Sequence, residues 1–201
     1  MYKQTVAKMM TGSSAIAHDL TIKAYLSNHS YGMIVNHLAP LKRCIDLINP
    51  YGNCMFQAIS KELLGTDRYH YQMRTLAVEF MATNPNYFSP VIANYHSRSL
   101  KEHIVLMKAD HIWGTAVELQ AMASLYQVAV KVLTYNTQAP NFRWNTYMPE
   151  SDLTKFEKPL YPSMVKGRVP SGYHVELYYH EGCLELPIKF LGKIQYHFQA
   201  H

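Results

Sequence analysis

Cysteine is scarce in this chain. Only Cys44, Cys54 and Cys183 occur among 201 residues, and no two of them form a CxxC pair. Three cysteines cannot all pair within one chain, so the sequence predicts a reducing compartment, the cytoplasm or the nucleus. The eleven histidines include no HExxH motif, and His180 with Cys183 alone is a poor metal site. We therefore expect no metal or other cofactor.

Long apolar segments and dense runs of charge are also missing. The segment from Met1 to Thr11 contains Lys3 and Lys8 without the apolar core of a signal peptide. No stretch reaches the length of a membrane span, so we expect a soluble protein with no membrane partner. The net charge of +5 comes from scattered Lys and Arg residues, which gives nucleic-acid binding little support.

The composition is that of a folded domain. Apolar residues make up 48% of the chain and charged residues 16%, which is typical of globular rather than disordered proteins. The length suits one domain with extensions. We predict a helical N-terminal extension over residues 1–40, a main domain over 41–182, and a C-terminal extension over 183–201 packed on that domain. We expect the protein to be a monomer.

Apolar periodicity and turn residues place the secondary structure. They predict helices over 54–64, 70–81, about 100–107 and about 117–126. They predict strands over 128–133, near 142–144 and over 172–179, with a further strand or short extension in 183–201. Helices come first and strands mostly later, which indicates an α+β fold with a small mixed or antiparallel sheet flanked by helices.

Gly52-Asn53-Cys54 is the most informative stretch. A short turn leads into a helix with apolar residues at helical spacing, which places Cys54 in the first turn of that helix. The helix dipole favours a thiolate there, and the backbone N–H groups of the turn can face an attacked carbonyl. A lone cysteine that begins an apolar helix is also consistent with a small buried hydrophobic residue.

A nucleophilic cysteine needs a base and a group that orients the base. His174 and Glu176 lie two residues apart on a predicted strand, so both belong to one face of it. A carboxylate there could fix the imidazole tautomer and stabilise the imidazolium. Alternatively, His174 is a half-buried strand histidine and Glu176 a solvent-facing residue. His70, His96, His103 and His111 have no comparable acid partner in the predicted elements, which favours a surface or structural role.

The chain resembles the ovarian-tumour (OTU) family of cysteine proteases, most of which are deubiquitinases. The resemblance extends from Leu47 to Tyr179 and rests on four segments in the family's order. They are Gly52-Asn53-Cys54-Met55-Phe56-Gln57-Ala58-Ile59, His70-Tyr71-Gln72-Met73-Arg74, Trp113-Gly114 with Glu118-Leu119-Gln120-Ala121, and Gly172-Tyr173-His174. The resemblance implies a papain-like α+β domain and ubiquitin or polyubiquitin as partner.

The resemblance also implies roles for individual residues. Cys54 would be the nucleophile, His174 the general base and Glu176 the group that orients it. The backbone amides of Gly52, Asn53 and Cys54 would form the oxyanion hole, and no cofactor would be needed. We expect Trp113 and Glu118 to be structural.

The chain departs from the family's pattern near these residues. Tyr51 stands where the family commonly has Asp, Gln57 where Arg is frequent, and Glu176 where Asp or Asn is usual. Val175 replaces a residue that is often aromatic. These departures leave open a second interpretation, an OTU-like module that binds ubiquitin, another protein or RNA with little or no turnover. A third is cleavage of a ubiquitin-like modifier or a viral-type polyprotein.

Overall fold

The computed structural model of the protein describes residues 33, 36–41, 43–48, 52–136, 141–153, 174–180 and 190–196. Most of the predicted N-terminal extension lies outside these residues. The chain divides into two compact units, Met1–Cys44 with Tyr196–His201 and Ile45–Gln195. The second unit contains the candidate site. Within the described ranges, no helix combines the length and apolar character needed to cross a membrane.

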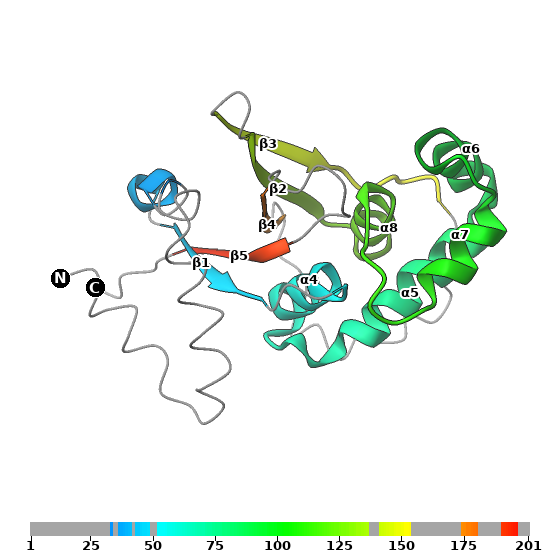
Figure 1. The fold of residues 1–201 in the computed structure, drawn as a ribbon, viewed down its shortest axis with the longest axis horizontal. Coiled ribbons are helices and arrows are strands. Elements are labelled where there is room, and N and C mark those ends of the chain that lie inside the picture. The colour runs from blue at the N-terminus through cyan, green and yellow to red at the C-terminus, as the bar shows by residue number, and fades with distance from the viewer. Residues whose placement is uncertain are drawn as a thin grey trace. The chain divides into compact units, whose positions relative to one another are not determined.

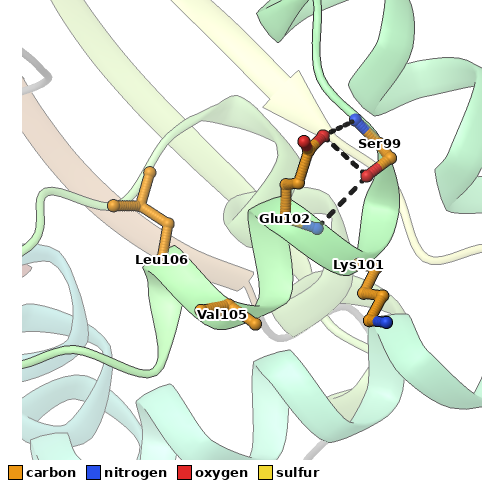
Figure 2. Close-up of a pocket in the computed structure, with 5 residues that line it drawn as sticks. All are labelled: Ser99, Lys101, Glu102, Val105 and Leu106. Atoms are coloured by element: carbon orange, nitrogen blue, oxygen red, sulfur yellow. Dashed lines mark hydrogen bonds between the residues drawn. The ribbon is translucent and has the colours of Figure 1, made fainter.

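The predicted helices form at the predicted places. The described α-helices are α4 (Cys54–Leu64), α5 (His70–Thr83), α6 (Pro85–His96), α7 (Leu100–Met107) and α8 (Ala116–Tyr126), with short 3-10 segments at Ala39–Leu41 and Asp67–Tyr69. Gly65 ends α4 in the left-handed conformation at φ 75°, as its position after the last apolar residues predicts. A capping box of Ser99 and Glu102 begins α7, and Figure 2 shows its reciprocal hydrogen bonds.

Helix α6 is not expected from the sequence, because prolines usually interrupt helices. Pro85 is in the first turn, where its missing N–H costs nothing. Pro90 lies inside the helix and removes one backbone hydrogen bond. Phe88 and Ile92 are fully buried on this helix. Packing of these two side chains therefore outweighs the unfavourable proline.

The strands form a mixed sheet. They are β1 (Arg43–Leu47), β2 (Ala129–Asn136), β3 (Asn141–Tyr147), β4 (His174–His180) and β5 (Phe190–Tyr196), in the order β1-β5-β4-β2-β3. β2 pairs with β3 in antiparallel and with β4 in parallel orientation, and β4 pairs with β5 in antiparallel orientation. This arrangement confirms the predicted α+β class with a small mixed sheet.

The helices pack in two groups beside this sheet. Helix α4 contacts β4, and α8 contacts β2 and β3, while α5 contacts each of α4, α6, α7 and α8. Figure 1 shows α4 and α8 lying between the strands and the group formed by α5, α6 and α7. The buried apolar cluster draws on all these helices and on Val130 and Val132 of β2. The N-terminal part of α4 is thus held inside the core.

A buried polar pair joins α7 to α8. His103 Nε2 lies 2.6 Å from Glu118 Oε1, and both side chains are almost fully buried. The other Glu118 oxygen accepts from the backbone N–H and hydroxyl of Thr115, each at 2.7 Å. The expectation that His103 lacks an acid partner is therefore wrong. The same expectation is wrong for His111, an exposed residue whose Nε2 lies 3.2 Å from Asp110 Oδ2. Tertiary packing brings these partners together.

Hydrogen bonds keep Glu118 ionised despite its burial. Burial alone raises the pKa of Glu118, but hydrogen bonds from His103 and Thr115 outweigh it and leave the pKa below its usual value. A carboxylate only accepts, so His103 donates from Nε2. This gives Glu118 the structural role that was expected for it.

We expect Glu118→Gln to lower the free energy of unfolding by about 1–3 kcal/mol, because an amide cannot accept from every donor around it. Because the pKa of Glu118 is lower in the folded than in the unfolded protein, its ionisation stabilises the fold at any pH above the unfolded-state pKa of about 4.3. This stabilisation disappears as the pH falls through the folded-state pKa. The difference in free energy of unfolding between wild type and Glu118→Gln, measured by urea unfolding, should therefore become smaller below about pH 4.

Glu102→Gln is the matched control, because Glu102 occupies the same capping-box position in α7 but is exposed. Glutamine also serves at that position, so we expect a loss below about 1 kcal/mol. Equal losses in the two variants would contradict the structural role assigned to Glu118.

Candidate active site

Residues 52–54 form a tight turn that we call the nucleophile turn. Gly52 and Asn53 are turn residues, and Cys54 is the first residue of α4, as the sequence predicts. The first N–H groups of an α-helix lack partners within the helix, so they are available to an anion at this end. The turn therefore combines a thiol with backbone hydrogen-bond donors.

Cys54 is fully buried, with 0% of its surface exposed. Burial alone would fit the alternative of a small hydrophobic core residue. The polar groups around the turn set it apart from such a residue.

The loop between α7 and α8 lies directly against the nucleophile turn. A Cβ atom at position 52 would be 1.7 Å from the His111 carbonyl oxygen, so no larger residue fits while the loop keeps this position. A Cβ at position 114 would similarly be 2.1 Å from the terminal carbon of Met55. The two glycines therefore permit the loop backbone to approach both the turn and α4 closely.

Arg74 of α5 binds the turn and the loop together from within the core. It is only 2% exposed. Its Nη2 donates to Gly52 O at 2.9 Å, Asn53 Oδ1 at 2.7 Å and Ile112 O at 2.5 Å. Its Nη1 donates to Met107 O at 3.2 Å. One guanidinium therefore fixes the peptide between Gly52 and Asn53, the end of α7 and the middle of the facing loop.

The surroundings of Arg74 stabilise its buried charge. The guanidinium lies over the Phe56 ring, with its carbon 4.4 Å from the ring centroid. Burial lowers the pKa of Arg74, whereas Asp110, Glu118, Tyr71 and Cys54 oppose the shift. Arginine remains protonated in proteins, so a full positive charge lies near the thiol. Such a charge favours the thiolate form of a cysteine.

The candidate base and acid lie on β4. His174 is its first residue and pairs in register with Ala129 of β2, while Glu176 pairs with Lys131. Helix α4, which begins with Cys54, contacts β4. The side chains of β4 lie outside the described residues. The fold thus brings the elements of Cys54 and His174 into contact across 120 positions of sequence.

Arg74 and Asp110 are site residues that the sequence analysis did not assign. Arg74 falls on the apolar stripe of its predicted helix, between Met73 and Ala77, and a basic residue on a buried face signals a buried partner. Asp110 is on a loop, where no periodicity indicates what it contacts. Trp113 packs partly buried against the core, in agreement with the structural role expected for it.

The surface hollow drawn in Figure 2 is separate from these residues. It has a volume of about 560 Å³ and is lined by Ser99, Lys101, Glu102, Val105 and Leu106 on and before α7. None of the candidate catalytic residues lines it. No group of three or more His, Cys, Asp or Glu side chains suited to a metal ion occurs in the described part of the chain.

We expect Arg74→Met to lower the free energy of unfolding by about 3–5 kcal/mol, because buried acceptors in the turn and loop lose their donor. The loss of stability in Arg74→Lys should lie between zero and that of Arg74→Met, since an ammonium cannot reach acceptors on both the turn and the loop. Exposed Arg68→Met serves as control and should change stability by less than about 0.5 kcal/mol in urea unfolding. A loss for Arg74→Met as small as that of Arg68→Met would contradict the role of Arg74.

Comparison with known proteins places the chain in a family. Residues 49–182, more than half of the chain, match the family of OTU-like cysteine proteases. The chain is 25% identical over 100 residues to the Arabidopsis thaliana OVARIAN TUMOR DOMAIN-containing deubiquitinating enzyme 6, a match covering 50% of this chain and 19% of that protein. The chain spans about a fifth or less of the length of the curated relatives it matches.

Solved structures share the fold at low sequence identity. The OTU domain of OTUD1 matches with a TM-score of 0.63 and 20% identity, over 87% of this chain and 99% of that one. The Hazara virus OTU bound to ubiquitin matches with a TM-score of 0.51 and 13% identity, over 75% of this chain and 81% of that one. The residues that match the family, 49–182, include the nucleophile turn, α5, α8 and β4. The chain belongs to the family of OTU-like cysteine proteases.

Proposed function

We propose that the protein is a deubiquitinase, a thiol isopeptidase that cleaves the bond between the C-terminal glycine of ubiquitin and a lysine. One observation carries the proposal: Cys54 begins α4, His174 begins β4, and these two elements are in contact. The family of the chain supplies the reaction class. The Hazara virus OTU bound to ubiquitin and the deubiquitinating relative in Arabidopsis support ubiquitin as the substrate.

The reaction begins with transfer of the Cys54 proton to His174. The sulfur attacks the glycine carbonyl carbon, and the resulting oxyanion accepts hydrogen bonds from the backbone N–H groups of Gly52, Asn53 and Cys54. The imidazolium of His174 then protonates the lysine nitrogen as the C–N bond breaks, leaving a thioester. Glu176 orients the imidazole and stabilises its charged form.

Water completes the cycle. His174 takes a proton from water, which attacks the thioester carbonyl and forms a second oxyanion at the same turn. Collapse of this intermediate breaks the C–S bond, releasing a carboxylate on ubiquitin and returning the proton to Cys54. A narrow channel toward the sulfur would admit the Gly-Gly tail of ubiquitin and exclude larger side chains. The buried Cys54 is in keeping with restricted access.

We expect a ubiquitin probe with an electrophilic C-terminus to label the wild-type protein, and linked ubiquitin chains to be cleaved to monoubiquitin. Cys54→Ala should abolish both, a loss of about 10⁶-fold in turnover. Cys44→Ala removes a different thiol and should retain both, as read by gel shift and intact mass. Chain binding without labelling or cleavage would instead support the binding module.

We expect Glu176→Gln to lower kcat by about 10²- to 10⁴-fold, because a neutral amide cannot stabilise the imidazolium of His174. Glu176→Asp keeps the charge and should retain much more activity. Steady-state cleavage of a fluorogenic ubiquitin substrate measures both variants. A kcat within about twofold of wild type for Glu176→Gln would assign Glu176 to the solvent-facing alternative.

A further inference from the structure

We propose that Asp110 is a positioning residue for the oxyanion hole and acts through the side-chain amide of Asn53. The inference rests on the proposed function, because an oxyanion hole matters only if the protein carries out acyl transfer. Asp110 lies on the loop between α7 and α8, far in sequence from the nucleophile turn.

The Asn53 side chain forms a bridge between two charged groups. Asn53 precedes α4 as its N-cap residue but makes no side-chain capping hydrogen bond. Its Nδ2 instead donates to Asp110 Oδ1 at 2.6 Å, and its Oδ1 accepts from Arg74 Nη2 at 2.7 Å. Arginine only donates and a carboxylate only accepts, so a single orientation of this amide satisfies both partners. The amide is thereby fixed between a cation and an anion.

Asp110 is itself held in place by several donors. The backbone N–H of His111 donates to its Oδ1 at 2.9 Å, and its Oδ2 lies 3.2 Å from His111 Nε2. The hydrogen bond from Asn53, followed by the interactions with Tyr71 of α5 and with His111, holds the pKa of Asp110 below its usual value. The side chain is therefore ionised at neutral pH.

The backbone beside Asp110 supports the same conclusion. His111 adopts the left-handed conformation at φ 61°, which costs a non-glycine residue about 1 kcal/mol. In this conformation the carbonyl oxygen of His111 lies against Gly52, at the position that a Cβ atom would occupy in any other residue. The contacts of the loop with the nucleophile turn compensate for this cost. The loop and the turn therefore form one unit, with Asp110 and Asn53 as its polar link.

This link bears on the transition state more than on substrate binding. Donors in an oxyanion hole must point at the position where the negative oxygen forms, and small displacements weaken them strongly. Asn53 lies between the two peptide groups that carry the N–H of Asn53 and the N–H of Cys54. Fixing its side chain limits rotation of both peptide groups. Loss of Asp110 should therefore lower kcat and leave KM nearly unchanged.

We expect Asp110→Ala to lower kcat for a fluorogenic ubiquitin substrate by about 10- to 100-fold, with KM within about twofold of wild type. Affinity for ubiquitin with a C-terminal aldehyde, which forms a tetrahedral adduct with Cys54, should fall by the same factor as kcat. Affinity for unmodified ubiquitin should not change. Asp152→Ala removes an exposed carboxylate elsewhere and should match wild type in all three measurements.

A charge exchange tests the link itself. Asn53→Asp places a second carboxylate against Asp110 and should lower kcat at least as much as Asp110→Ala. In the double variant Asn53→Asp with Asp110→Asn, an amide donor again faces a carboxylate acceptor. Its kcat should therefore be about tenfold higher than that of Asn53→Asp alone. Wild-type kcat in Asp110→Ala, or purely additive losses in the double variant, would overturn the proposal.

Hydrogen exchange separates this inference from the proposed function. If the wild-type protein neither cleaves nor binds ubiquitin, the proposed function fails. The positioning role is then decided by amide exchange in residues 52–57, which should be about tenfold faster in Asp110→Ala than in wild type. Unchanged exchange in this segment would show that Asp110 does not hold the turn.

Discussion

The site depends on one buried guanidinium. Arg74 donates to the nucleophile turn, to the last residue of α7 and to the facing loop, so three segments converge on one rigid group. Its guanidinium also lies over the Phe56 ring, which accommodates the positive charge within the core. A buried charge that makes this many hydrogen bonds defines a single geometry, because any alternative leaves acceptors unsatisfied. The nucleophile turn is therefore held rigidly by these hydrogen bonds.

The packing of α4 against β4 complements this constraint. A cysteine at the first position of a helix and a histidine at the first position of a strand can approach each other only if those elements are in contact. Helix α4 is surrounded by apolar side chains, which fixes its N-terminus within the core. The helix end then supplies donors for an anion, while Arg74 and Asp110 control how those donors are presented.

Local sequence signals predicted the elements but not the contacts between them. Gly65 ends α4 and the Ser99 capping box begins α7 because glycine and serine act on their immediate neighbours. Helix α6 was missed because tertiary packing outweighs its internal proline. The contacts of Arg74 and Asp110 with the nucleophile turn join segments more than twenty positions apart, which no periodicity encodes. The Thr115 capping box, with Glu118 three residues later, was a detectable signal that was not used.

The pairing of Cys54 with His174 is best tested by the pH dependence of Cys54 alkylation. Iodoacetamide modification of the peptide containing Cys54 can be followed by mass spectrometry in wild type and in His174→Ala. A thiolate stabilised by an imidazolium reacts at lower pH than an ordinary thiol. We expect the alkylation rate of the wild-type protein to reach half its maximum at a lower pH than the rate of His174→Ala. Superimposable profiles in the two proteins would contradict the pairing.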